Sequence, residues 1–394
     1  MAIEILGMVG TKEVSETRGS YFDGPAVDAA YLTRFAQAHD EAGFDRVLIG
    51  YGATAPDGFA VAGHVLAHTR RLGVLIAHRP GFVAPTLAAR KLATLDQLSG
   101  GGRVAIHHIS GGNDADQRRD GDFADHDTRY ARTAEFMDVL RRTLTSDAPF
   151  DHEGPFYRFE GAYSSVKPAT AAGIPLFFGG QSEAAVEVGA RHADVYMLFG
   201  EPLEQTAERI ALLRAEAAKH GRTLRFSLST RPIVAATEEA AWARAEAIAA
   251  ETRRRAEAAR VSAALVAGPA GSSGPAGSSG SAGSAGSAAA GRALFATSGS
   301  VASARLQEVA ARQQVYDERL WFGVTALTGP GGNSSGHVGT PQQVADALLR
   351  YHEIGVDTFL IRGFDPYDDV VDWGRELIPA LRAGASRVRE VVHS

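Results

Sequence analysis

The chain has 394 residues and a formal net charge of −6, and 45% of its residues are hydrophobic, which is ordinary for a globular protein with a sizeable core. The negative balance excludes a strong electrostatic attraction to nucleic acid or to an anionic membrane surface. The lack of cysteine excludes disulfides, thiolate metal ligands and a cysteine nucleophile. No apolar run approaches the ~18 residues that a membrane span requires, and the first residues show no signal peptide, so we expect a cytoplasmic protein.

Short β-branched or apolar runs alternate with amphipathic stretches along the whole chain. Eight runs are predicted strands: Ile3–Val9, Arg46–Tyr51, Leu72–His78, Val104–Ser110, Pro175–Gly180, Val195–Gly200, Phe226–Val234 and Thr358–Gly363. Strands that alternate with helices indicate βαβ units and a parallel sheet. Eight such units predict a closed (β/α)8 TIM barrel of class α/β, which a final helix over Val370–Leu381 would complete. In that fold the chemistry lies where strands end and helices begin.

Two segments interrupt this rhythm and are predicted insertions, one after strand four and one after strand seven. Gly111–Ile174 is long and contains short β structure near Phe150–Ser165. Gly268–Gly291 contains only Gly, Ala, Ser and Pro, a composition that cannot bury enough apolar surface to offset its ordering entropy. We therefore expect one domain over 1–394 with a flexible insertion at 262–304, which is either inert or a lid over the barrel mouth.

The clearest candidate binding motif is Gly179-Gly180-Gln181-Ser182, which follows an apolar strand and opens a helix. Glycines let the backbone approach a ligand closely, and a helix N-terminus offers free N–H groups to an anion. Ser182 can cap the helix or donate to a phosphate. An anion site and a capped tight turn both remain open from these residues alone.

Polar residues also follow strand four. Ser110 lies at the predicted rim, with His108 on the same side of the strand, while the adjacent His107 points to the opposite face. Because no further histidine and carboxylate ligands are matched to them, we expect no catalytic metal. His126 and Tyr130 are four residues apart on one helical face, so they either bind an anion together or are surface residues beside a buried tyrosine.

Three arginines follow strands three, seven and eight: Arg79, Arg231 and Arg362. Arginine binds planar or multi-oxygen anions well, so these side chains could form a cationic pocket over the barrel. Structural salt bridges are the alternative for each of them.

A set of motifs spread over essentially the whole chain resembles the bacterial-luciferase-like flavin monooxygenases, and most of all their alkanesulfonate monooxygenase branch. The resemblance is carried by Pro85–Ser99, Asp120–Phe123, His126–Tyr130, Ala134–Phe136, Phe178–Ser182, Gly200–Pro202, Ala217–Arg222 and Leu320–Val324. It implies a (β/α)8 barrel whose insertion before strand eight acts as a lid. It also implies a homo-oligomer that uses O2 and reduced FMN, the flavin being delivered by a separate NAD(P)H-dependent flavin reductase.

Carried over by position, the resemblance assigns the flavin phosphate to Tyr130, Gly180, Gln181 and Ser182, and the flavin lining to Thr54, Ala55, Ser110 and His126. His126 is counted with Arg231 and Arg362 among the catalytic candidates. The pocket residues of sulfonate oxidisers are not kept, because their positions are held here by Ala55, Ser229, Thr328, Phe364 and Pro366. Arg231 and Arg362 would replace the lost positive charge.

The resulting hypothesis is an FMNH2- and O2-dependent monooxygenase that converts a small organosulfur anion, a sulfonate, to an aldehyde and sulfite. Three alternatives remain open. The first is hydride transfer with the deazaflavin F420, which needs no oxygen. The second is a metal-dependent barrel hydrolase, which the missing metal ligands disfavour, and the third is a flavin-binding protein without catalysis.

Overall fold

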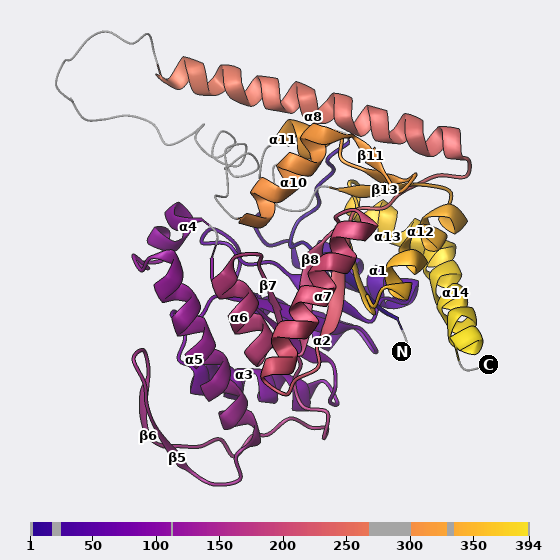
Figure 1. Ribbon diagram of the computed structural model, residues 1–394. Helices are drawn as coiled ribbons and strands as arrows, with labels where there is room; N and C mark the ends of the chain where they lie inside the picture. Colours follow the sequence, from indigo (N-terminus) through magenta and orange to yellow (C-terminus); the bar gives the residue numbers. More distant parts are fainter. Residues whose placement is uncertain (1–2, 18–24, 112, 268–300, 329–334, 393–394) are drawn as a thin grey trace, which may run out of the picture.

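The computed structural model describes residues 3–17, 25–111, 113–267, 301–328 and 335–392. Eight parallel strands close into a barrel, which confirms the predicted (β/α)8 fold (Figure 1). In chain order, and in order around the barrel, the strands are β1 Glu4–Val9, β2 Arg46–Ile49, β3 Gly73–His78, β4 Val104–His108, β7 Leu176–Gly179, β8 Val195–Phe199, β9 Arg225–Thr230 and β14 Thr358–Ile361.

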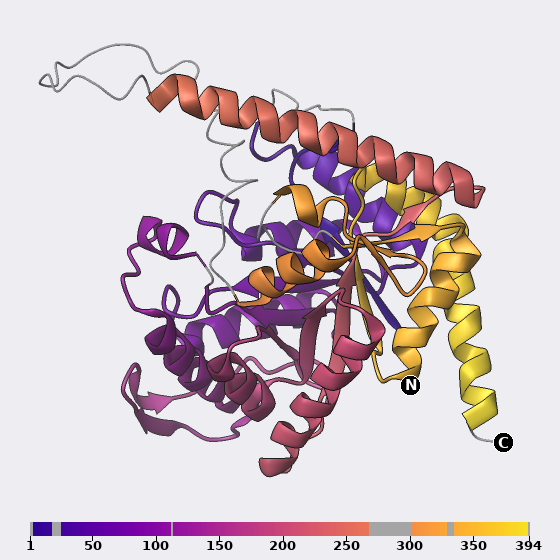
Figure 2. The same ribbon diagram turned by 45° about the horizontal axis from the view of Figure 1, so that its top comes forward.

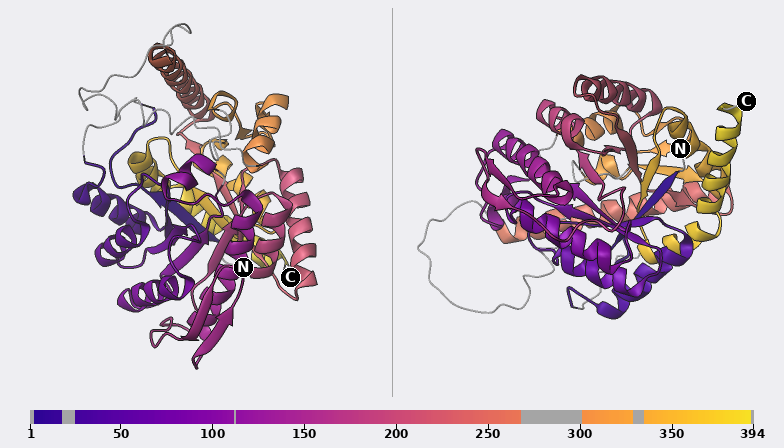
Figure 3. Two further views of the ribbon diagram at one scale, coloured as in Figure 1. Left: turned by 90° about the vertical axis from the view of Figure 1, so that its left-hand side faces the viewer. Right: turned by 90° about the horizontal axis from the view of Figure 1, so that it is seen from below.

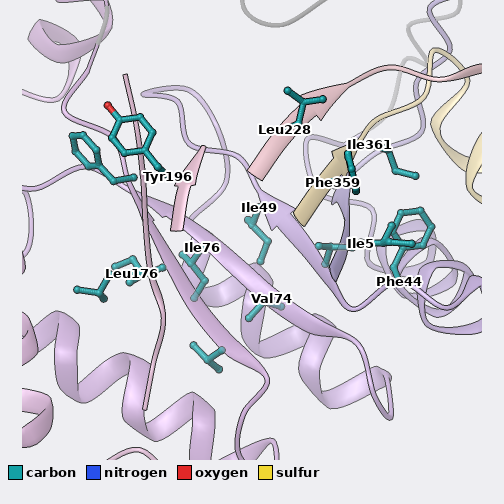
Figure 4. Packing of buried hydrophobic residues seen from close by; sticks show 14 of the residues in the cluster. Ile5, Phe44, Ile49, Val74, Ile76, Leu176, Tyr196, Leu228, Phe359 and Ile361 are labelled. Atoms are coloured by element: carbon teal, nitrogen blue, oxygen red, sulfur yellow. The ribbon is translucent and has the colours of Figure 1, made fainter. Parts of the chain in front are cut away.

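The strands are rich in apolar residues because the barrel buries both faces of its wall. One set of side chains fills the interior, among them Leu6, Leu75 and Phe177. The alternate set, which includes Val74 and Ile76 on β3, packs outward against the helices (Figure 4). All six residues of β3 are buried for this reason.

Helices surround the barrel (Figure 3). They are α1 Ala29–Ala42, α2 Gly58–His68, α3 Pro85–Leu98, α5 His126–Thr145, α6 Glu183–His192, α7 Leu203–Lys219, α12 Pro341–Glu353, α13 Pro366–Arg375 and α14 Leu377–Val392. Local sequence sets their ends. Thr340 and Gln343 form a capping box at the start of α12, and Gly43 ends α1 with a left-handed φ of 85°.

Two predicted elements are each divided in the structure. The strand predicted over Phe226–Val234 is wrong as one unit: β9 ends at Thr230, and Ile233–Val234 form β10 in a separate sheet. Pro232 has no N–H to donate and so interrupts the barrel ladder. The predicted closing helix over Val370–Leu381 is likewise two helices, α13 and α14. Pro379 is the reason, because its ring would clash with the carbonyl group of residue 375 in a continuous helix.

The chain between β9 and β14 builds a small layer of its own on the barrel. A four-stranded sheet has the order β10, β13 Gly336–Gly339, β12 Leu320–Trp321 and β11 Val315–Tyr316. The long helix α8 Glu238–Ala267 packs on this sheet through Ile233, Trp321 and Val338, and it crosses one end of the molecule (Figures 1 and 2). Helix α10 Val301–Arg312 packs against Leu320 and Phe322, and the short α11 Thr325–Thr328 follows.

These helices bear on the predicted flexible insertion at 262–304. Because α8 extends to Ala267 and α10 starts at Val301, both ends of that range are helical. Residues 268–300, which include the Gly/Ala/Ser tract, lie outside the described residues. Whether this tract acts as a lid therefore stays a prediction.

The chain between β4 and β7 carries α4 Asp114–Arg119 and an antiparallel ribbon of β5 Phe150–Glu153 and β6 Arg158–Ala162. The β structure predicted within Phe150–Ser165 is therefore present. Glu135 of α5 anchors the ribbon by accepting the N–H groups of Phe156 and Tyr157 at 3.0 and 2.9 Å. In the part of the chain that the structure describes, no helix combines the length and apolar character of a membrane span.

Candidate active site

The predicted anion site is assembled where β7 ends and α6 begins. Ser182 caps α6, and its Oγ accepts the N–H of Ala185 at 3.2 Å. The hydroxyl of Tyr130, from α5, forms a hydrogen bond with Ser182. Burial raises the pKa of Tyr130, so its phenol stays protonated and can donate a hydrogen bond. The structure thus brings Tyr130, Gly180, Gln181 and Ser182 together beside the free N–H groups of a helix N-terminus.

Gly180 lets the chain pass close to the first turn of α6. Its φ is +153°, and a Cβ there would lie 2.6 Å from the Cβ of Ala185 and 3.1 Å from the hydroxyl oxygen of Tyr130. A side chain would therefore collide with the first turn of α6 and press on the hydroxyl of Tyr130, so only glycine allows this close approach. We call the group formed by Tyr130, Gly180, Gln181 and Ser182 the cradle.

The cradle is tied to the chain around β8 and α10. The side-chain amide of Gln181 donates to Glu201 at 2.6 Å, and Nε of Arg305 donates to the other carboxylate oxygen at 2.7 Å. Glu201 is buried, and its backbone carbonyl accepts the hydroxyl of Tyr351 at 2.8 Å. The amide oxygen of Gln181 is buried and has no hydrogen-bond partner among the described residues. That acceptor is available to a ligand that carries a donor.

His126 stands at the edge of the cradle, at the first residue of α5. Its ring lies 4.7 Å from the ring of Tyr130, and Nδ1 is 2.7 Å from Asp127 Oδ1. The histidine side chain is 46% exposed. The predicted pairing of His126 with Tyr130 on one helical face is present.

Among the described residues, Thr54, Ala55 and Ser110 form no hydrogen bond or ion pair with the cradle. Thr54 and Ala55 are exposed in the turn after β2, which Asp116 holds by accepting the N–H of Ala53 at 3.2 Å. Ser110 is buried, and its hydroxyl donates to Thr133 of α5 at 3.0 Å. His108 faces the same side, where its ring packs 5.6 Å from Phe136 of α5 rather than in the barrel interior.

The three arginines at strand ends have three different environments. Arg79 is buried, lies 4.2 Å from the ring centroid of Tyr51, and pairs with Asp116 and Asp120 at 3.1 and 3.0 Å. These ion pairs are what the structural alternative for Arg79 predicts. Among the described residues, no group of three or more histidine, aspartate or glutamate side chains is placed to hold a metal ion.

Arg231 and Arg362 lie beside each other at the ends of β9 and β14. Arg231 is buried and binds Glu16 through both terminal nitrogens, at 2.7 and 3.1 Å. The side chain of Arg362 is partly exposed and has no hydrogen bond or ion pair within the described residues. Repulsion from Arg231, together with burial, lowers the pKa of Arg362 to about 10, so it stays charged at neutral pH.

No pattern in the sequence marks Glu16 as part of the site. The residue follows β1 in an irregular segment and is separated from Arg231 by 215 positions. No spacing pattern connects the two, and only the closure of the barrel between β1 and β14 brings them together.

The structure is a closed α/β barrel with the cradle after its fifth strand and two arginines after its last two, and enzymes with this architecture carry their sites at the carboxyl ends of the strands. The family model for luciferase-like monooxygenases matches residues 8–358. The chain belongs to this family and is a flavin-dependent monooxygenase.

Solved structures share the fold. The EDTA monooxygenase EmoA from Chelativorans sp. BNC1 is 18% identical with a TM-score of 0.71, and the match covers 98% of this chain and 95% of that one. DmoA from Hyphomicrobium sulfonivorans is 20% identical with a TM-score of 0.71, over 98% and 89% of the two chains. An F420-dependent secondary alcohol dehydrogenase is 15% identical with a TM-score of 0.62, over 97% and 99%.

Proposed function

We propose that this chain is the oxygenase of a two-component system in the alkanesulfonate monooxygenase branch. It takes reduced FMN from a separate NAD(P)H-dependent flavin reductase and uses O2 to oxidise a small sulfonate to an aldehyde and sulfite. The need for NAD(P)H and a reductase makes the cytoplasm the expected compartment, and a homo-oligomer is the expected assembly.

The cradle fits the phosphate of FMN. Its glycine lets the backbone lie close to the first turn of α6, and the helix N-terminus and the Tyr130 hydroxyl supply donors to an anion. The main-chain N–H groups of α6, Ser182 and Tyr130 would hold the phosphate, with Gln181 and His126 beside it. When bound, reduced FMN supplies the electrons that activate O2 for oxygen insertion.

The environment of Arg362 is the observation that supports an anionic substrate. The carboxylate whose charge reaches Arg362, that of Glu16, is already paired with Arg231, so this partly buried guanidinium has no ion pair of its own among the described residues and is costly unless an anion reaches it. It lies at the carboxyl end of β14, on the same face of the barrel as the cradle after β7. We infer that Arg362 binds the sulfonate oxygens and directs the carbon–sulfur end of the substrate toward the flavin, while the barrel wall excludes water.

The direct test is sulfite release from short alkanesulfonates in air, with reduced FMN supplied by a flavin reductase. Arg362→Ala should raise the KM for the sulfonate roughly tenfold or more, because a charge-assisted hydrogen bond contributes about 1.5–3 kcal/mol. The Kd for FMN should not change. Arg350→Ala removes an exposed cation from α12 and serves as the control. Absence of sulfite release from every sulfonate tried would refute the proposed reaction.

F420-dependent hydride transfer is the second candidate, supported by the F420-dependent enzyme that shares this fold over nearly the full length of both chains. Anaerobic binding separates the two. A preference for reduced FMN over reduced F420 supports the oxygenase, whereas tighter binding of reduced F420 and turnover without O2 would replace it with a hydride-transfer enzyme.

A further inference from the structure

The guanidinium group of Arg231 is already occupied by an acid of the protein. Its terminal nitrogens donate to both carboxylate oxygens of Glu16, one of them also to the carbonyl oxygen of Gly363 at 2.9 Å. The guanidinium carbon lies 3.6 Å from the ring centroid of Phe364, and the side chain is only 3% exposed. Glu16 thus forms the two-pronged contact that the carboxylate or sulfonate of a substrate would otherwise make.

Glu16 is held firmly in this position from both sides. Its own N–H donates to the carbonyl oxygen of Phe364 at 2.8 Å. Its neighbours Ser15 and Thr17 both donate to Asp365, each at 2.5 Å. The carboxylate therefore belongs to a built arrangement between the segment after β1 and the loop after β14.

Glu16 also interacts with the second cation. Burial raises the pKa of Glu16, but the charges of Arg231 and Arg362 more than offset this and lower it overall. Its carboxylate is consequently ionised at neutral pH and still 32% exposed, so its charge acts on an anion that approaches the two arginines. Arg255, which contributes to the same effect, is itself paired with Glu251 at 2.9 Å.

These contacts leave two guanidinium groups and one carboxylate at the ends of β9 and β14. We propose that Glu16 is a specificity-determining residue that neutralises Arg231 and so restricts the site to organic anions with a single negative charge, which Arg362 binds. The inference rests on the proposed sulfonate site and adds a charge limit to it. The carboxylate of Glu16 repels both negative charges of a dianion, only one charge of a monoanion, and none in a neutral molecule of the same shape.

The test compares three probes of similar size and different charge: dimethyl sulfone, methanesulfonate and methanedisulfonate. Their binding to the full chain loaded with reduced FMN is measured by calorimetry without oxygen. Glu16→Gln keeps the size of the side chain and an acceptor for Arg231 but removes the charge. The ratio of affinities for methanedisulfonate over methanesulfonate should rise roughly tenfold in this variant, and the affinity for dimethyl sulfone should not change.

Glu16→Asp keeps the charge and should keep the wild-type ratio. An unchanged ratio in Glu16→Gln would overturn the proposal, and so would an equal loss of affinity for all three probes and for FMN, which marks a purely structural role. A second variant guards against poor folding of the first: Arg362→Gln should abolish the preference for methanesulfonate over dimethyl sulfone, and a preserved preference would also overturn the proposal. Binding is measured without turnover, so the two proposals can fail separately. Failed sulfite release in air would refute the proposed reaction, whereas the affinity ratios alone decide the role of Glu16.

Discussion

At the scale of single residues, the cradle depends on side chains that hold one another in place. Ser182 caps α6 and contacts Tyr130, and Gln181 is fixed by the buried Glu201. Such prior positioning lowers the entropy that is lost when a ligand binds. The hydroxyl of Tyr130 is the group that tests this arrangement most simply, because it can be removed with little change in shape.

Tyr130→Phe should lower the affinity for reduced FMN roughly tenfold, since it removes one donor to a doubly charged phosphate. The affinity for riboflavin, which has no phosphate, should be unchanged. Fluorescence titration of both flavins checks this difference. Tyr157→Phe is a matched control, because the hydroxyl of Tyr157 is buried without a hydrogen-bond partner in the described chain. Equal weakening of both flavins by Tyr130→Phe would contradict its proposed contact with the phosphate.

At the scale of elements, the hairpin between β11 and β12 contains an unfavourable backbone conformation. Asp317 and Glu318 have φ values of 48° and 68°, and the N–H of Arg319 bonds the carbonyl oxygen of Tyr316 at 3.1 Å, which defines a type I′ turn. Asp317 is needed there, because its carboxylate accepts the N–H of Leu203 at 2.7 Å. Glu318 is exposed and makes no such contact with the part of the chain that the structure describes.

Glu318→Gly should stabilise the protein by about 0.5–1 kcal/mol. The left-handed conformation costs a non-glycine residue about 1–2 kcal/mol, and the extra freedom of glycine in the unfolded chain returns part of this gain. Urea denaturation measures the change. Glu318→Ala, which keeps the Cβ and therefore the strain, should show no gain. A similar gain in both variants would mean that the charge of Glu318, and not its backbone, is responsible.

Elements that depend on consecutive residues could be predicted from the sequence, whereas contacts between distant segments could not. The eight strands and the cradle follow from local patterns, because apolar runs and a strand–glycine–helix junction are each written in consecutive residues. Pro232 and Pro379 also indicate that the predicted strand and the predicted final helix are interrupted. The apolar pattern continues past both prolines, and for this reason the prediction treats each element as continuous. The pair of Arg231 with Glu16 was not legible, since it depends on the closure of the barrel and on no spacing in the chain.

At the scale of the whole molecule, α8 connects the layer above the barrel to the candidate site. Arg255 donates to the carbonyl oxygen of Ser15, next to Glu16, at 3.2 Å. Arg244 pairs with Asp365 and Asp369 on the other side, at 3.4 and 2.6 Å. The helix therefore holds both segments that place Glu16 against Arg231, so the charge balance of the site depends on the insertion as well as on the barrel.

The molecule also buries several histidines, which determine its response to acid. Burial lowers the pKa of His39, His78 and His107 to about 4, and that of His337 to about 3. These values lie below the ~6.5 of an unfolded chain, so the unfolded state binds more protons as the pH falls. Stability is therefore complete above pH 6.5 and decreases as the pH falls toward 4.

We expect urea denaturation to show little change between pH 8 and pH 7 and a steep loss between pH 6.5 and pH 5. Each such histidine contributes about 2 kcal/mol to the loss at pH 5, and four of them together approach the whole stability of a typical domain. His78→Leu removes one group and should reduce the loss by about 2 kcal/mol, whereas His220→Gln, at an exposed position, should leave it unchanged. Constant stability from pH 7 to pH 5 would show that these histidines accept protons without unfolding, and that their neutral burial is not what limits the fold in acid.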